Sequence, residues 1–424
     1  MKEIKIIGLG DCIISHKLSV HTEPEFLEMA DLVKSADLTV ANLETLIHDY
    51  EEDVYPSPQP GGSWMRTSSE LADEMLWLGI DMVSTANNHS LDYMYGGLFK
   101  TIYHLNRLKI KYAGTGKNLS DARKPAYVDT AGGRIGLISA SSTNAPFCVA
   151  GPARRDMNGR PGLNPLRYQE YYTSDEQIIS QLKEIYNKLG LKHDEEGERF
   201  FEKIFTIGEP LGRTTQPDPS DMAGNLESIR EALRQSDLVI FSLHCHQGRE
   251  NEFDKPATFV EEFARACIDE GAHLFLGHGP HVLMGIELRN GKPIFYSLGN
   301  FIYQNFSAER IPAEFYAKFS LDPYSGTPSD AYDERQKRHP AFIGEDSYKR
   351  WISVFPRMTF KDEKLTDLQL YPVYLGQDKP RSQRGRPLLA KGALAEKILK
   401  EIKALSLEYG TEIVIKDGIG KVIL

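Results

Sequence analysis

Carboxylate, amide and imidazole side chains directly follow five short apolar stretches of the chain. These side chains belong to Asp11, Glu44, Asn88 with His89, His244 with His246, and His278 with His281. Carboxylate and amide oxygens and imidazole nitrogens are the ligands that hard-to-borderline divalent metals prefer. Because ligand sites of α/β sheets lie beyond the carboxyl ends of the strands, we predict that these residues converge on one metal site.

Each of these positions also has an explanation that involves no metal. Asp11 could close a turn or cap a helix, and Glu44 could cap one as well. Asn88 could belong to a turn, since asparagine tolerates left-handed geometry. His244 and His246 could be hydrogen-bonded core imidazoles, although a spacing of two places both on one face of a strand. We favour the metal site because it accounts for all five coincidences together.

Buried strands that alternate with helices would bring these side chains to one edge, and the hydrophobic pattern predicts that alternation. Seven apolar runs predict strands at residues 4–9, 38–41, 82–86, 135–140, 238–243, 273–276 and 293–298. Apolar residues at helical spacing predict helices at residues 24–34, 69–78, 93–108 and 256–271. Strand–helix alternation of this kind predicts an α/β fold with helices packed on the sheet faces.

The predicted domain organisation follows from where this alternation stops. Residues 1–306 form the main domain, and a loop rich in Gly, Pro and Arg opens an insertion at about 148–225. Residues 307–424 form a C-terminal extension that packs on the core, and its first part, 307–348, shows no regular pattern. The tail predicts two strands, a helix and a hairpin, at 351–360, 365–375, 390–405 and around Asp417-Gly418.

Bulk composition and the missing motifs exclude several classes of protein. The 424 residues carry a net charge of −10, which argues against a broad basic surface for nucleic acid. The N-terminus lacks a signal-peptide pattern, and no stretch approaches the roughly 18 apolar residues of a membrane span. The sequence contains no complete P-loop, no GxSxG elbow and no HExxH helix. We therefore expect a cytoplasmic protein with no membrane anchor and no nucleic-acid partner.

Six short motifs together resemble the CapA family, which takes part in poly-γ-glutamate capsule biosynthesis and is a branch of the calcineurin-like metallophosphoesterase superfamily. The matching residues are Gly10-Asp11, Asn42-Leu43-Glu44, Ala86 to Asp92, His246 to Glu250, Gly277 to Leu283 and Tyr296 to Phe301. They span most of the predicted main domain. Any one motif alone is a weak signal, whereas the set is highly specific for the family.

The resemblance implies a four-layer α/β/β/α sandwich with a centre of one or two divalent ions at the sheet edge, with Mn, Zn or Fe favoured and Mg as an alternative. Asp11 would hold one metal, Glu44 would bridge two, and Asn88 would bind the second. The remaining implied ligands are His246, His278 and His281. His89 would contact the substrate as a general acid or charge stabiliser, and the metal would lower the pKa of the attacking water.

Two details of this implied site have alternatives. Phosphoesterases of the superfamily carry a histidine two residues after the first aspartate, where this chain has Ile13. His244 or His16 would have to replace that ligand. Asp92 could orient His89 through a hydrogen bond or cap the helix that follows, and we slightly favour the cap.

The leading functional hypothesis is a metal-dependent hydrolase that acts on an ester, amide or phosphoester bond of an anionic small molecule or peptide. Guanidinium groups bind carboxylates and phosphates through paired hydrogen bonds. The predicted insertion supplies Arg154, Arg155, Arg160 and Arg167. These arginines would bind the anionic substrate, or they would only solvate an exposed loop. The alternatives are a non-hydrolytic component of poly-γ-glutamate biosynthesis and a metal-bearing binding module.

Overall fold

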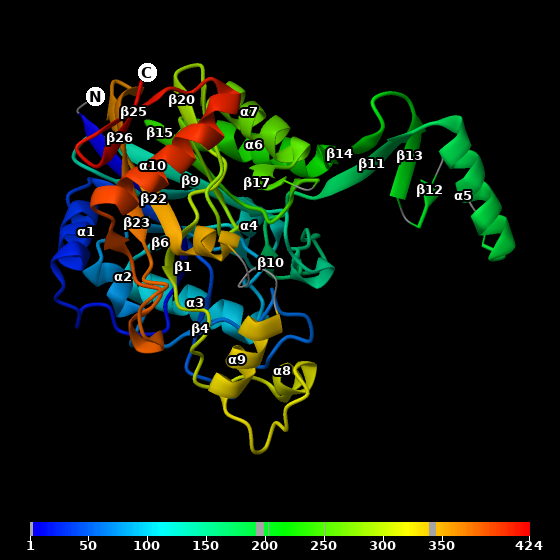
Figure 1. The fold of residues 1–424 in the computed structure, drawn as a ribbon, viewed down its shortest axis with the longest axis horizontal. Coiled ribbons are helices and arrows are strands. Elements are labelled where there is room, and N and C mark those ends of the chain that lie inside the picture. The colour runs from blue at the N-terminus through cyan, green and yellow to red at the C-terminus, as the bar shows by residue number, and fades with distance from the viewer. Residues whose placement is uncertain (1–2, 192–198, 202, 251, 339–344) are drawn as a thin grey trace.

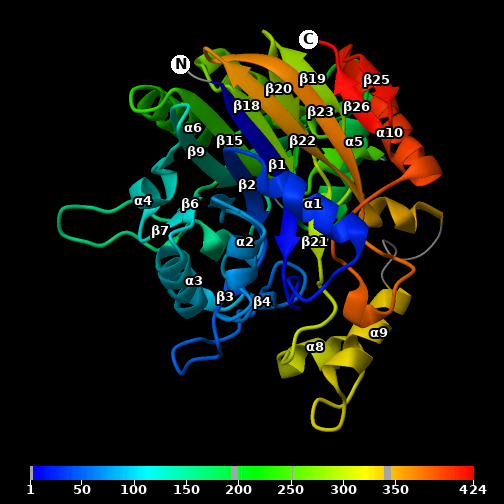
Figure 2. The same ribbon diagram turned by 90° about the vertical axis from the view of Figure 1, so that its left-hand side faces the viewer.

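Two stacked β-sheets with helices outside them form the body of the protein (Figure 1). The computed structural model describes residues 3–191, 199–201, 203–250, 252–338 and 345–424. Both chain ends lie at the same end of the molecule in the two views of Figures 1 and 2.

The first sheet is built around the N-terminal strand β1 (Ile4–Ile13). β2 (Leu38–Leu43) lies parallel to β1 on one side and is followed by β5 (Met82–Ser84). On the other side, β22 (Ile352–Lys361) pairs antiparallel with the start of β1, and β21 (Asn300–Tyr303) pairs parallel with its end. Within the described residues this sheet has ten strands, and the others are β6 (Lys111–Ala113), β23 (Lys364–Tyr374), β24 (Leu388–Leu389), β25 (Ile413–Lys416) and β26 (Ile419–Val422).

The second sheet has six strands in the part of the chain that the structure describes, in the order β19-β20-β18-β15-β9-β8. Its central strands β9, β15 and β18 are parallel, so their carboxyl ends meet at one edge. The bounds are β8 (Ala126–Asp129), β9 (Arg134–Ser141), β15 (Leu238–His244), β18 (Leu274–His278), β19 (Ile286–Arg289) and β20 (Lys292–Phe295).

Alternation along β1 explains how the layers stack. Ile4 and Ile6 face the second sheet and share a core with its Leu137 and Ile240. Ile7 and Leu9 of β1 face the other way. They belong to a core shared with α1, α2 and α3, which lie together along the first sheet (Figure 2). A third core joins the second sheet to α6 and α7. The helix bounds are α1 (Pro24–Lys34), α2 (Asp73–Trp77), α3 (Met94–Leu108), α6 (Pro219–Leu233) and α7 (Thr258–Glu270).

This arrangement of helices, sheet, sheet and helices confirms the predicted α/β class and its four layers. Each of the seven predicted strands of the main domain and each of its four predicted helices coincides with an observed element. The tail matches as well, through β22, β23, α10 (Gly392–Ser406) and the β25–β26 hairpin. Among the described helices, none combines the length and the apolar character needed to cross a bilayer.

Part of the predicted insertion forms an arm that projects from the body (Figure 1). The arm contains a four-stranded sheet and a helix, which are β11 (Tyr168–Ser174), α5 (Glu176–Lys188), β12 (Arg199–Phe200), β13 (Lys203–Ile207) and β14 (Gly212–Pro217). Residues 192–198 and 202 lie outside the described part of the chain. The sequence prediction missed α6, which begins inside the predicted insertion but packs on the second sheet.

The predicted C-terminal extension contributes strands to the first sheet, because β22 pairs directly with β1. The domain boundary at residue 306 stays a prediction. In the stretch 307–348, expected to be irregular, the structure has α8 (Ala313–Lys318) and α9 (Pro328–Arg338), while residues 339–344 lie outside the described part of the chain.

Gly10 lies where β1 passes close to the turn before β21. A Cβ atom at Gly10 would lie 2.0 Å from Gly299 O, and Asp11 N donates to that same carbonyl at 3.0 Å. We expect Gly10→Ala to lower the free energy of unfolding by about 1–3 kcal/mol through overpacking, as measured by urea denaturation. Gly208→Ala is the matched control, because its Cβ would meet only Thr173 Cγ2, at 3.3 Å. Equal losses in the two variants would contradict this explanation.

Candidate metal centre

The polar residues predicted to form one site do converge at the carboxyl ends of the central strands. Asp11 lies in β1 next to Asn42 of β2, and His244 at the end of β15 lies next to His278 at the end of β18. The two sheets meet here, because His278 Nδ1 lies 3.8 Å from Asp11 Oδ1. All of these side chains are buried.

Asp11 is an ionised carboxylate held by hydrogen bonds from both sheets. Its Oδ1 accepts from Asn42 Nδ2 at 2.8 Å, and its Oδ2 accepts from Gly279 N at 3.2 Å. Burial by itself would raise the pKa of Asp11, but the hydrogen bond from His281 and the charges of the surrounding histidines hold that pKa below its usual range. Asp11 is therefore a negative charge at the base of the site.

Glu44, just beyond β2, is buried and has no hydrogen-bond partner in the described residues at either carboxylate oxygen. Its Oε1 faces three imidazole nitrogens, at 3.7 Å from His281 Nε2, 3.8 Å from His89 Nε2 and 3.9 Å from His244 Nε2. Burial, followed by the charges of Asp11 and Asp92, raises the pKa of Glu44 well above its ordinary value. An unpartnered buried carboxylate is costly, and a bound cation would remove that cost.

His281 presents a lone pair to this carboxylate. Asn300 Nδ2 donates to a backbone carbonyl, so its Oδ1 can only accept, and His281 Nδ1–H is shared between this oxygen, at 2.8 Å, and Asp11 Oδ2, at 3.2 Å. The Nε2 lone pair of His281 is then free to face Glu44. His281 also has a φ of 60°, in the left-handed region, and backbone strain of this kind is concentrated at functional sites.

His246 is the second imidazole that can offer a lone pair. Burial, followed by the charge of His281, lowers its pKa to about 3, so the ring is neutral. Its Nε2 is buried and lacks a hydrogen-bond partner among the described residues. Ligand atoms of Glu44, His246 and His281 all lie within 4.8 Å of one another. The donor set and these unpartnered atoms fit a divalent cation.

His244 and His278 adjoin this triad. β15 ends at His244, so His246 does not lie on the same strand face as predicted, but the rings of the two residues are 5.0 Å apart. His244 Nδ1 accepts from Asn42 Nδ2 at 3.1 Å, so its Nε2 carries the proton and points at Glu44. Burial lowers the pKa of His278 to about 4, and neither of its ring nitrogens has a hydrogen-bond partner in the described part of the chain. The ligand roles of both stay predictions.

The two residues considered as substitutes for the missing histidine lie in different places. His244 lies beside Glu44, whereas the Nδ1 of His16 lies near the hydroxyls of Ser15 and Ser307, at 3.1 and 3.3 Å. Asn88, predicted as a ligand, keeps its Oδ1 buried without a partner while its Nδ2 donates to a backbone carbonyl at 2.7 Å. That oxygen therefore remains available for a metal.

Asp92 does not cap the following helix, and the slightly favoured interpretation of this residue was wrong. α3 begins at Met94, and its cap position forms no side-chain hydrogen bond. Asp92 Oδ2 instead lies 2.6 Å from His89 Nδ1, and backbone N–H groups of Gly61 and Met65 donate to the same carboxylate at 2.9 and 2.7 Å. These contacts fix Asp92, which in turn orients His89 toward Glu44.

Sequence reasoning assigned no role to three asparagines that position the site. Asn42 joins Asp11 to His244, and Asn300 holds His281. Asn87 holds the loop between β5 and α3 in place by donating to Leu43 O and Asn42 Oδ1. All three lie inside the quoted motifs, which was the available signal.

The four arginines of the insertion make contacts outside this cluster. Arg154 pairs with Asp156, and Arg167 makes two hydrogen bonds to Asp221, at 2.6 and 2.8 Å. Arg155 is exposed. Arg160 donates to a backbone carbonyl and, with Arg167, lines a pocket of about 280 Å³. Their role in substrate binding stays a prediction.

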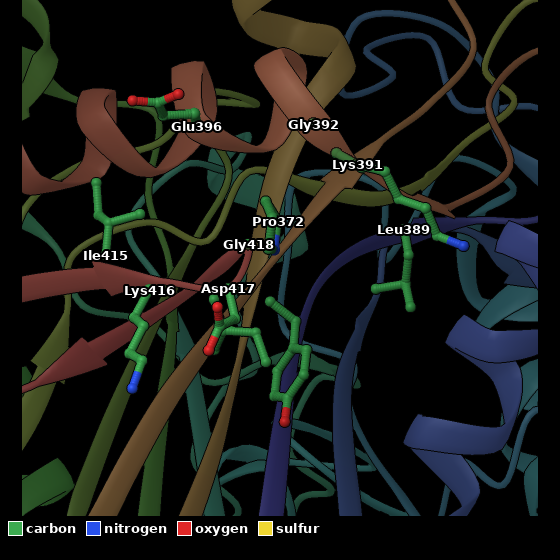
Figure 3. A pocket seen from close by; sticks show the side chains of 12 residues that line it. Pro372, Leu389, Lys391, Gly392, Glu396, Ile415, Lys416, Asp417 and Gly418 are labelled. Carbon is green, nitrogen blue, oxygen red and sulfur yellow. The ribbon is translucent and has the colours of Figure 1, made fainter.

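A larger pocket, of about 670 Å³, lies between the start of α10 and the β25–β26 hairpin (Figure 3). Its lining carries no histidine, and its carboxylates are those of Glu396 and Asp417. None of the predicted site residues lines it. It therefore lacks the ligands that the centre at the strand ends provides.

Comparisons with known proteins identify the family of the chain. The sequence model of the family described as "Bacterial capsule synthesis protein PGA_cap" matches residues 5–305. Two uncharacterized proteins of Sinorhizobium fredii, y4sH and y4uA, are each 33% identical over 431 residues, covering 99% of this chain and 93% of each relative. The PGA biosynthesis protein CapA of Bacillus subtilis is 23% identical over 351 residues, covering 81% of this chain and 74% of that protein. The chain belongs to the PGA_cap family of bacterial capsule synthesis proteins, within the metallophosphoesterase-like superfamily.

Proposed function

We propose that this protein is a metal-dependent hydrolase that acts on an ester, amide or phosphoester bond of an anionic small molecule or peptide. The observation that supports the proposal most is the unpartnered, buried carboxylate of Glu44, which lies within 4.8 Å of a ring nitrogen of His246 and one of His281. Such a group of buried acceptors is costly without a cation. Carboxylate and imidazole ligands suit Mn, Zn or Fe.

Glu44, His246 and His281 would hold the ion, with Asp11 and the Oδ1 of Asn88 as further ligands. A divalent ion bound there would supply a Lewis acid that lowers the pKa of water and polarises the scissile group. Every other contribution to the reaction comes from the chain itself. Asp11 and Glu44 set the negative charge of the site, and the asparagines fix the orientation of the imidazoles.

His89 would act on the substrate. Its Nδ1–H donates to Asp92 Oδ2, which fixes the tautomer and leaves Nε2 toward the centre, 3.8 Å from Glu44 Oε1. When its Nε2 carries a proton, His89 would donate that proton to the leaving group, or donate a hydrogen bond to developing negative charge.

A second candidate function is a non-hydrolytic part in the synthesis of a poly-glutamate polymer. The names of the family and of the Bacillus subtilis relative favour it, since both refer to synthesis and not to hydrolysis. The same metal centre would then hold carboxylates of the polymer without turnover, as in a binding module.

Metal removal and reconstitution test the leading proposal. We expect mass spectrometry of the purified protein to find a bound divalent metal, and EDTA treatment to abolish hydrolysis of a panel of p-nitrophenyl esters, phosphoesters and poly-γ-glutamate. Adding back Mn, Zn or Fe should restore turnover. Equal rates with and without metal would contradict the proposal, and metal binding without turnover on any substrate would favour the second candidate.

A further inference from the structure

A residue outside the family match lies against the metal centre. Arg350 belongs to η3 (Glu345–Trp351), the short helix that leads into β22, whereas the family match ends at residue 305. Asn300 Nδ2 donates to Arg350 O at 2.9 Å, and the Oδ1 of the same asparagine accepts from His281 Nδ1 at 2.8 Å. One asparagine therefore connects the backbone of Arg350 to a candidate metal ligand.

The residues on both sides of Arg350 are anchored. The ring of Trp351 packs edge-on against Tyr303 at 5.5 Å, and Tyr303 in turn lies 5.5 Å from the ring of His281. On the other side, Lys349 Nζ pairs with Asp254 at 3.3 Å. These contacts hold the backbone of Arg350 at the rim of the centre.

Arg350 is partly buried, and its guanidinium has no ion pair or hydrogen bond to another described residue. Its charge nevertheless reaches three candidate ligands. Burial, Asp11 and Asp92 raise the pKa of Glu44, and Arg350 opposes that rise. Burial is the largest cause of the lowered pKa of His246 and of His281, and Arg350 lowers both further. An arginine so placed has N–H donors free to bind an anion.

The arginines of the insertion are less suited to this task. The guanidinium of Arg167 is already paired with Asp221 through two hydrogen bonds, and Arg154 is paired with Asp156. Arg350 has both the position beside the ligands and the unpaired donors.

We propose that Arg350 binds an oxyanion of the substrate, a carboxylate or a phosphate, beside the metal centre. Its planar group of N–H donors would hold two oxygens of the anion at once. The inference rests on the proposed function, because it names the residue that selects anionic substrates at that site. It also assigns part of the site to the C-terminal segment that the family match does not cover.

Titration calorimetry with two probes, inorganic phosphate and the dicarboxylate glutarate, tests the proposal on the full chain loaded with Mn²⁺. We expect Arg350→Gln to weaken binding of the preferred probe about 10- to 100-fold, the range for losing a charged hydrogen bond. Arg350→Lys keeps the charge but not the planar group of N–H donors, so it should lose less affinity than Arg350→Gln. The metal content and melting temperature of Arg350→Gln should match those of the wild type. Arg234 is an exposed arginine at the end of α6, and Arg234→Gln should leave the affinity for both probes unchanged.

Unchanged affinity for both probes in Arg350→Gln would overturn the proposal, as would a metal-loaded wild type that binds neither probe. Repeating the titration on metal-free protein separates the two hypotheses. If the wild type takes up no metal but binds the probe, and Arg350→Gln weakens that binding, the proposed function fails and the anion site stands. Tighter binding of phosphate identifies a phosphoester substrate, and tighter binding of glutarate identifies a carboxylate.

Discussion

Replacing His89 with alanine should lower the kcat/KM of hydrolysis by about 100- to 10,000-fold, the usual contribution of a positioned general acid. His89 is held by Asp92 and points its Nε2 at the centre, yet it does not belong to the triad of Glu44, His246 and His281. Metal content, measured by mass spectrometry, should therefore stay at the wild-type level. This combination separates a role toward substrate from a role as ligand.

His21→Ala is the control for this experiment. His21 lies near Arg386, with Nδ1 2.9 Å from its guanidinium, and contacts no residue of the centre. It should keep full activity. Full activity in His89→Ala would contradict the proposed mechanism, and loss of metal in that variant would make His89 a ligand instead.

Replacing Glu44 with glutamine should weaken metal binding on the order of 100-fold, because one of about four ligands of a site worth about 10–16 kcal/mol is lost. Competition with a coloured chelator measures the affinity. His16→Ala should leave it unchanged, since His16 lies with Ser15 and Ser307. Unaltered affinity in Glu44→Gln would show that the metal, if bound, lies elsewhere.

The same variant carries a pH signature. The pKa of Glu44 in the folded metal-free protein lies well above the ordinary value of 4.5. The stability that this group contributes is therefore present below pH 4.5 and is lost as the pH rises through its folded pKa. Glu44→Gln removes that loss, so the metal-free variant should be less destabilised at neutral pH than the metal-free wild type. Chemical denaturation across this pH range measures the difference, and parallel curves would contradict it.

Local sequence patterns were sufficient for most of the fold. Apolar runs of strand length and helical spacing predicted the layers, because each central strand is buried on both faces and each covering helix has one apolar face. α6 was missed because its N-terminal half lies in a polar, Pro-rich stretch, and its packing depends on the second sheet. The arm was recognised as an interruption but not as a sheet, since its strands are only partly buried.

Candidate ligands could be named from the sequence, whereas the residues that orient them could not, and the ligand roles stay predictions. The ligands follow strands, so position along the chain marked them. The hydrogen bond between Asn42 and His244 joins residues far apart in sequence, as does the one between Asn300 and Arg350. No local pattern encodes such contacts. Asp92 shows the opposite failure, because a pattern typical of a cap was overridden by a local hydrogen bond with His89 and two tertiary ones with backbone N–H groups.

The pairing of β1 with β22 has a consequence for the synthesis of the protein on the ribosome. β1 leaves the ribosome before β22, its antiparallel neighbour, which begins only at Ile352. Until then, the edge of β1 from Ile4 to Ile7 has no partner of its own, and open edges invite pairing with other chains. The pairing of the strand that carries Asp11 is therefore completed only once β22 has been made, and the nascent chain must keep this edge protected until then.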